Sequence, residues 1–104
     1  MQRIAFKMTL FPGHAEEYKR RHDEIWPELA ALLKESGISD YSIFLDPATN
    51  TLFATLVRAT DHRMDDLPKH PVMRRWWDYM RDIMTYDADG TPAVAPLVPM
   101  FHLA

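Results

Sequence analysis

Near the middle of the chain lies the sequence Tyr41-Ser42-Ile43-Phe44-Leu45-Asp46-Pro47-Ala48-Thr49-Asn50-Thr51-Leu52-Phe53-Ala54-Thr55-Leu56-Val57. Its two ends, residues 41–45 and 52–57, are rich in the β-branched and aromatic residues that favour strands. The segment between them, residues 46–50, contains the Asp, Pro and Asn typical of a turn. The sequence therefore predicts a β-hairpin, and apolar side chains occur on both alternating sets of its residues.

A strand and a helix are predicted before this hairpin. From Ile4 to Leu10, apolar residues alternate with others, which is the pattern of a strand with one buried face. Pro12 and Gly13 end that strand, and residues 14–35 then show helical periodicity. Pro27 has no N–H to donate within a helix, so we expect a kink or a break near residues 23–26. The apolar stripe of this helix consists of Ile25, Leu29, Leu32 and Leu33.

Two helices and a last strand are predicted after the hairpin. A short helix is expected from Thr60 to about Leu67, and a longer one is expected after Pro71. A final strand is expected around residues 98–103, and the prolines in this region predict that it is short or lies at a sheet edge. The apolar stripe of the longer helix consists of Met73, Trp76, Met80, Ile83 and Met84.

The predicted order of strand, helix, strand, strand, helix, strand indicates an α+β domain with the ferredoxin-like βαββαβ plan. One such domain accounts for residues 1–104. Its two helices cover one face of a four-stranded antiparallel sheet and leave the other face bare. Because Phe44 and Phe53 add apolar side chains on the parity opposite to Ile43 and Leu52, we expect a homodimer whose sheets pack face to face. A sheet face covered by the C-terminal segment is the alternative.

The composition excludes several classes of protein. The chain has 104 residues, a net charge of −3 and no cysteine, so disulfides, thiolate metal sites and thiol nucleophiles are excluded. Its basic residues are dispersed among acidic ones, and nucleic acid is therefore not an expected partner. No apolar run approaches the ~20 residues that cross a bilayer, and the N-terminus lacks the apolar core of a signal peptide. We expect a cytoplasmic protein without a membrane partner.

Tyr18 and His22 are the first candidates for chemistry. They are four residues apart in a predicted helix, so their side chains lie on one face and can contact a shared ligand. An imidazole populates both protonation states near neutral pH, which suits it to proton transfer. The alternative is that His22 is a surface residue among the charged side chains beside it in the sequence.

Trp76, Trp77 and Tyr41 are the next candidates. Adjacent residues of a helix point about 100° apart, so the two tryptophans cannot both occupy the centre of a narrow core stripe. Aromatic faces stack on the C–H face of a sugar ring, and an indole N–H donates to hydroxyl groups. The alternative is that Trp76 lies in the core and Trp77 at a dimer contact. Tyr41 opens a predicted strand and offers its hydroxyl to a ligand or to solvent.

Metal sites receive little support from the sequence. The other histidines lack metal-ligand spacing with one another and with nearby carboxylates, so no metal site is expected. They are His14, His62, His70 and His102. The segment Asp87-Ala88-Asp89-Gly90 resembles part of a calcium loop, but its glycine is misplaced and the closing glutamate is absent. A turn is expected there.

Phosphate and nucleotide sites are also disfavoured. The chain has three glycines and no glycine-rich phosphate loop, which argues against chemistry on a nucleotide cofactor. Arg20-Arg21 and Arg74-Arg75 are pairs of cations that can bind an anion. We interpret them as solvated side chains on helix faces, which is the commoner arrangement.

Four segments contain or adjoin these candidate residues. They are Glu17-Tyr18-Lys19-Arg20-Arg21-His22, Ile25-Trp26-Pro27-Glu28-Leu29, Tyr41-Ser42-Ile43-Phe44-Leu45-Asp46 and Arg75-Trp76-Trp77-Asp78-Tyr79-Met80. Together they resemble the L-rhamnose mutarotase family, and the likeness extends over essentially the whole chain. The resemblance implies a small cytoplasmic homodimer that forms a dimeric α/β-barrel of ferredoxin-like subunits. It further implies that His22 is the proton donor and that Tyr18, Tyr41, Trp76 and Trp77 bind the sugar.

The reaction implied by the resemblance interconverts the α and β anomers of L-rhamnopyranose, in L-rhamnose metabolism. A proton leaves the anomeric hydroxyl and a proton reaches the ring oxygen, so ring opening and reclosure need general acid–base catalysis and no metal or redox cofactor. Two alternatives come from other classes. One is a cofactor-independent monooxygenase of the same dimeric barrel plan, acting on an aromatic substrate. The other is a non-catalytic sugar-binding module.

Overall fold

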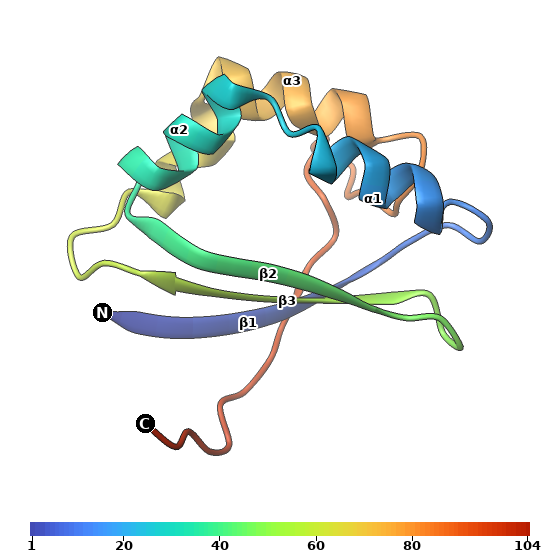
Figure 1. The fold of residues 1–104 in the computed structure, drawn as a ribbon. Helices are drawn as coiled ribbons and strands as arrows, with labels where there is room; N and C mark the ends of the chain where they lie inside the picture. Colours follow the sequence, from blue (N-terminus) through green and yellow to red (C-terminus); the bar gives the residue numbers. More distant parts are fainter.

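The computed structural model describes all 104 residues, and it has four strands, three α-helices and one 3-10 helix (Figure 1). In chain order these are β1 (Gln2–Thr9), α1 (Ala15–Asp23), α2 (Pro27–Glu35), β2 (Ile38–Asp46), β3 (Thr51–Arg58), η1 (Met64–Lys69), α3 (Pro71–Met80) and β4 (Ala95–Pro96). The strands form one antiparallel sheet in the order β2-β3-β1-β4, and the helices lie over one of its faces. The predicted α+β class, the hairpin and the βαββαβ order are confirmed.

A bulge in β2 sets which of its side chains face the helices. The register shifts between Ser39 and Ser42, so that Asp40 and Tyr41 together lie opposite one residue of β3. Asp40 adopts a positive φ of 49° at this irregularity. As a result, Ile38 and Tyr41 both face the helix layer although they are three positions apart. Ile38 joins the core, and Tyr41 lies beside the pocket described below.

Pro27 separates two helices, as predicted. Helix α1 ends at Asp23 and α2 begins at Pro27, because a proline is tolerated in the first turn of a helix but not in its interior. The chain between them is not helical. Helix α1, which carries Tyr18 and His22, therefore has a direction of its own above the sheet (Figure 1).

The last strand differs from its prediction. It is β4 at residues 95–96, not a strand at residues 98–103. Prolines at positions 96 and 99 have no N–H to donate to a ladder, and the pairing with β1 ends after Leu97 donates to the carbonyl of Ala5. The chain beyond is exposed and leaves the sheet on the side opposite the helices (Figure 1).

The two segments before and after Pro71 also have shifted boundaries. The short helix is a 3-10 helix at residues 64–69 instead of 60–67, and the N–H of Met64 at its start bonds to the His62 ring. Helix α3 ends at Met80, so Ile83 and Met84 lie beyond it instead of on its apolar stripe. Both remain buried, because the chain turns back and Met84 pairs with Leu10 next to β1.

The core lies between the helices and the inner face of the sheet. Its largest fully buried side chains are Leu10, Leu29, Leu52, Leu56, Met80 and Ile83. The outer face of the sheet carries the cross-strand pair Phe44 and Phe53, which are 66% and 37% exposed. The C-terminal segment therefore does not cover Phe44. None of the helices has both the length and the apolar character needed to cross a lipid bilayer.

Candidate active site

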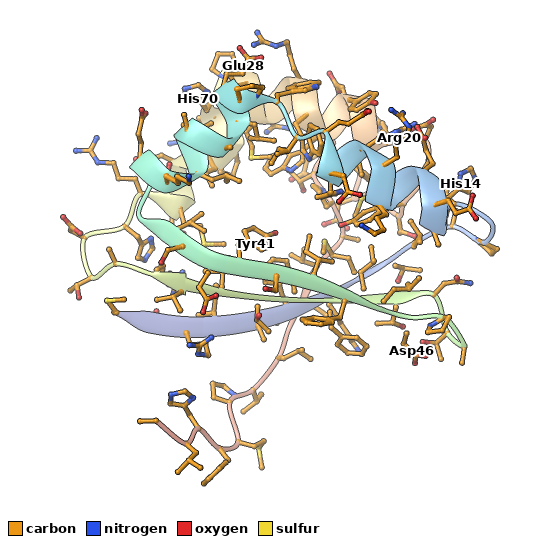
Figure 2. The ribbon with its side chains drawn as sticks, in the orientation of Figure 1. His14, Arg20, Glu28, Tyr41, Asp46 and His70 are labelled. Carbon is orange, nitrogen blue, oxygen red and sulfur yellow. The ribbon has the colours of Figure 1, made fainter.

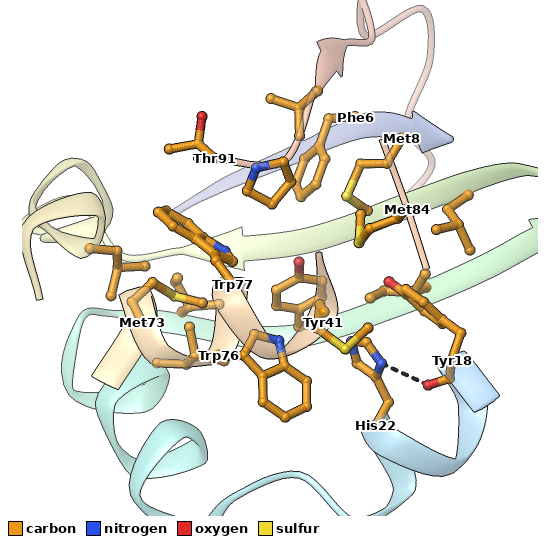
Figure 3. Close-up of a pocket in the computed structure, with 18 of the residues that line it drawn as sticks. Phe6, Met8, Tyr18, His22, Tyr41, Met73, Trp76, Trp77, Met84 and Thr91 are labelled. Carbon is orange, nitrogen blue, oxygen red and sulfur yellow. Dashed lines mark hydrogen bonds between the residues drawn. The ribbon is translucent and has the colours of Figure 1, made fainter. Parts of the chain in front are cut away.

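A pocket of about 1590 Å³ lies between the helices and the inner face of the sheet, and most of its lining residues are apolar. Figure 2 shows the side chains that project into this space, with Tyr41 among them. All five residues singled out from the sequence border it, and Figure 3 shows them together with the apolar side chains around them. They are Tyr18, His22, Tyr41, Trp76 and Trp77. The structure thus brings together residues from α1, β2 and α3.

Tyr18 and His22 lie on the same face of α1, as their spacing predicts. Their rings stack with centroids 4.3 Å apart and planes inclined by 26°. The edge of the His22 ring also meets Trp76 of α3, with centroids 5.4 Å apart and planes at 90°. His22 is half-buried and lines the pocket, so it is not the surface residue that its charged sequence neighbours suggest. Its ring is held between two aromatic rings from different helices.

One ring nitrogen of His22 is occupied by the backbone. Its Nδ1 lies 3.0 Å from the carbonyl oxygen of Tyr18. Because a carbonyl oxygen only accepts hydrogen bonds, Nδ1 carries the hydrogen, and Nε2 of the neutral ring carries the lone pair. Burial lowers the pKa of His22 below its ordinary value of 6.5, although the Tyr18 carbonyl and the Asp23 carboxylate act in the opposite direction. At neutral pH the resting form is thus a neutral imidazole with a basic Nε2.

The two tyrosine hydroxyls of the site remain protonated. Burial raises the pKa of Tyr18 well above its ordinary value, and it raises the pKa of Tyr41 to about 12. Tyr41 is 39% exposed and lines the pocket, where its side chain lies among those of the other candidate residues (Figure 3). Neither hydroxyl has a hydrogen-bond partner within the protein, so both are available to donate to a ligand.

The two tryptophans have different environments. Trp76 is 5% exposed and belongs to the core, where its ring meets the rings of His22, Trp26 and Tyr79. Trp77 is half-buried and borders the pocket, and the guanidinium of Arg74 lies 5.5 Å from its ring centroid. The two tryptophans thus do not both lie at the centre of the core, and Trp77 is the one that is less buried.

Sequence reasoning missed two aromatic residues that support the site. Trp26 packs against Trp76 with ring centroids 5.1 Å apart, and it belongs to the segment that Pro27 breaks. Tyr86 lines the pocket, and its hydroxyl donates to the carbonyl oxygen of Trp77 at 2.5 Å. Trp26 lies next to the helix break predicted at Pro27, and that position could have indicated a residue near the site. Tyr86 lies in a polar segment whose sequence does not indicate a contact with the site.

The remaining candidates do not form a site. The structure has no group of three or more His, Asp or Glu side chains placed to bind one metal ion. The segment Asp87–Gly90 forms the expected turn, in which the N–H of Gly90 donates to the carbonyl of Asp87. The exposed Asp89 accepts bonds from the N–H and the hydroxyl of Thr91 on one carboxylate oxygen, which stabilises this turn.

Comparisons with known proteins agree over the full chain. Residues 3–103 match the family model described as L-rhamnose mutarotase. L-rhamnose mutarotases from Burkholderia ambifaria and Sinorhizobium fredii are 62% and 59% identical to this chain, with 99% and 100% of both chains covered. The crystal structure of an L-rhamnose mutarotase from Formosa agariphila superposes with a TM-score of 0.93 over 100% of both chains, at 44% identity. The chain therefore belongs to the L-rhamnose mutarotase family.

Proposed function

We propose that this protein interconverts the α and β anomers of L-rhamnopyranose and that His22 moves the proton. The observation that carries the proposal is the neutral imidazole of His22, whose free Nε2 borders a pocket that also holds two protonated tyrosine hydroxyls and an indole wall. Family membership over the full chain gives the substrate class. The pocket residues supply a proton acceptor, hydrogen-bond donors and an aromatic wall for the reaction.

The steps need one proton carrier. Nε2 of His22 accepts the proton of the anomeric hydroxyl, the carbonyl of the open aldehyde forms at C1, and the bond from C1 to the ring oxygen breaks. The imidazolium then returns the proton to the former ring oxygen, which becomes a hydroxyl. The two oxygens are bonded to the same carbon, so one imidazole can reach both. After rotation about the bond between C1 and C2, the reverse steps close the ring with the other configuration.

The other site residues bind the sugar in this proposal. Trp77 offers a flat wall to the C–H face of the ring, while Tyr18 and Tyr41 donate hydrogen bonds to its oxygens. Tyr18 is stacked on His22, so its hydroxyl can assist at the reacting oxygens. Trp76 lies mostly behind His22 and holds the imidazole ring against the pocket. A hydroxyl with a raised pKa is a hydrogen-bond donor and a poor acid, which leaves proton transfer to His22.

Saturation-transfer NMR tests the function directly. The exchange rate between the anomers of L-rhamnose is measured with and without the protein, with L-fucose and D-glucose as comparison sugars. Faster exchange of L-rhamnose supports the proposal. Binding without acceleration would indicate a sugar-binding module, and consumption of oxygen with a quinol would indicate a monooxygenase. Either of those results contradicts the proposed reaction.

The proposed order of proton transfers predicts the pH dependence. Because neutral His22 is the starting form and its pKa lies below 6.5, kcat/KM for anomer exchange should be nearly constant between about pH 7.5 and 8 and should fall towards pH 5, as the imidazole becomes protonated. The rate is measured by NMR at each pH after subtraction of spontaneous exchange. A catalysed rate that rises as the pH falls towards 5 would show that the imidazolium is the starting form.

We also propose that two copies pack through the outer faces of their sheets. The main support is the exposed pair of Phe44 and Phe53, because large exposed apolar side chains next to each other mark an interaction surface. Apolar residues of the C-terminal segment on the same side are also 79–89% exposed. They are Val98, Met100, Phe101 and Leu103. A homodimer that buries both sets has the face-to-face sheets predicted from the sequence pattern and corresponds to the dimeric α/β-barrel that the family resemblance implies.

A single charge on this face should separate the two copies. We expect the unaltered protein to sediment as a dimer and Phe44→Asp to sediment as a monomer, because burying an unpaired carboxylate in an apolar contact is costly. Analytical ultracentrifugation at several concentrations measures both. The matched control is Ala31→Asp, which adds the same charge on an exposed position of α2, on the opposite side of the molecule. A Phe44→Asp variant that remains dimeric would place the contact elsewhere.

A further inference from the structure

A largely buried arginine joins α1 to the end of α3. The Arg21 side chain is 8% exposed, and its Nη1 donates to the carbonyl oxygen of Tyr79 at 2.7 Å. Its Nη1 and Nη2 also donate to the two carboxylate oxygens of Asp82, at 2.9 and 3.2 Å, and its Nε donates to Glu17 at 2.7 Å. The guanidinium lies 4.4 Å from the centroid of the Tyr79 ring. Arg21 is thus not the solvated arginine expected from the sequence.

The contacts of Arg21 serve both helices. Tyr79 lies in the last turn of α3, where backbone carbonyls have no partner within the helix, and a cation at this end is favourable. On α1, Tyr18 and Arg21 are the only two buried residues. Tyr18 is part of the pocket wall, so Arg21 is the one side chain outside the site that anchors α1 by burial. The carboxylates of Glu17 and Asp82 and the carbonyl of Tyr79 accept hydrogen bonds from all three guanidinium nitrogens of Arg21, as a buried cation requires.

Helix α1 therefore carries two adjacent rows of side chains with i, i+4 spacing. Tyr18 and His22 form the row that borders the pocket, and Glu17 and Arg21 form the row that contacts α3. Glu17 directly precedes Tyr18, and Arg21 directly precedes His22, so a rotation or shift of α1 moves both rows together. His22 must keep its distance to a sugar that is bound by residues of β2 and α3. The bond from Arg21 to α3 fixes that distance.

We propose that Arg21 is a positioning residue for His22, which locks α1 against the C-terminal end of α3 and thereby sets the place of the imidazole in the pocket. The proposal rests on the proposed function of His22. Its effect should fall on proton transfer more than on sugar binding, because Tyr41 and Trp77 are held by other elements and only Tyr18 among the proposed sugar contacts lies on α1. A displacement of about 1 Å of a catalytic group can cost on the order of 10²-fold in rate.

The test compares Arg21→Met, Arg21→Lys and Asp82→Asn with Arg20→Met. Arg20 is the matched control, because it is the neighbouring arginine on α1, is half-exposed, and pairs with Glu17 and Glu24. For each variant, kcat and KM of L-rhamnose anomer exchange are measured by NMR, and the His22 ring is titrated by NMR. Thermal unfolding gives the folded fraction, and rates are expressed per folded protein.

We expect Arg21→Met to lower kcat by about 10- to 100-fold with a change in KM of less than about threefold. The pKa of His22 should rise towards its ordinary value, by more than in Arg20→Met, because looser packing of α1 admits water to the imidazole. Both variants remove one cation from α1, so the difference between them reports packing. Arg21→Lys should recover part of kcat, and Asp82→Asn should show a smaller loss in the same direction.

Kinetics and a His22 titration equal to those of Arg20→Met would overturn the proposal, even if the melting temperature of Arg21→Met falls. If Arg21→Met does not fold, Arg21→Lys and Asp82→Asn decide in the same way, since Asp82 is largely exposed and its replacement leaves the core intact. A protein without any catalysed exchange would contradict the proposed function. The titration of His22 would then still show whether Arg21 holds the imidazole in place.

Discussion

Replacing His22 by asparagine should lower the catalysed rate of L-rhamnose anomer exchange by about 10²- to 10⁴-fold, the usual contribution of a positioned acid or base. The asparagine amide can still donate to the Tyr18 carbonyl that now accepts from Nδ1. It has no nitrogen that accepts a proton at neutral pH. The substitution thus removes proton transfer while it keeps the local hydrogen bond, and KM should change much less than kcat.

No other residue of the pocket can take over this role. His22 is the only histidine that lines it. The raised pKa values of Tyr18 and Tyr41 keep both hydroxyls protonated, so neither is a base near neutral pH. Four carboxylates also border the pocket, but all four belong to exposed residues, unlike the half-buried imidazole. They are Glu16, Asp23, Asp87 and Asp89, and Asp23 pairs with Lys19. The loss of His22 should therefore not be rescued by raising the pH to 8.

His14→Asn is the matched control for this prediction. His14 precedes α1, and its side chain makes no capping hydrogen bond to the helix. Its replacement should leave the exchange rate unchanged. A His22→Asn variant with full activity would remove His22 from the mechanism, and equal losses in both variants would indicate an effect on α1 as a whole.

Local signals predicted much of this arrangement. The spacing of Tyr18 and His22 fixes their common face once α1 forms, because helical periodicity needs no knowledge of the rest of the chain. The break before Pro27 is equally local, since it follows from the missing N–H of proline. These two local features explain why the shared face of Tyr18 and His22, and the end of their helix before Pro27, could be predicted without a structure.

The missing parts depend on contacts that are distant in sequence. Tyr41 faces the helices together with Ile38 only because of the bulge at Asp40. An aspartate in an otherwise regular strand pattern does not predict a bulge. The partner of Arg21 is Asp82, 61 residues away. A pair of arginines on an amphipathic helix gives no sign of such a partner, so the commoner solvated arrangement was predicted and was wrong for Arg21.

The two adjacent tryptophans should respond differently to replacement by alanine. Trp76→Ala removes a core side chain that is 5% exposed and meets three other rings, so it should lower the free energy of unfolding by about 3–5 kcal/mol. At about 4–8 °C per kcal/mol for a domain of this size, the melting temperature should fall by more than 10 °C. The loss of support for the His22 ring should also reduce kcat of the protein that remains folded.

Trp77→Ala should instead affect sugar binding. Trp77 is half-buried and borders the pocket, and the Tyr86 hydroxyl donates to its backbone carbonyl, which the substitution keeps. We expect KM for L-rhamnose to rise by about tenfold, equivalent to about 1.4 kcal/mol of binding, with a smaller loss of stability than in Trp76→Ala. Urea unfolding and NMR exchange at several sugar concentrations measure both effects on the same samples. The opposite result would be a less stable Trp77→Ala and a higher KM for Trp76→Ala. It would assign Trp76 to the pocket wall and Trp77 to the core, because adjacent helix residues point about 100° apart and cannot both lie at the centre of the core stripe.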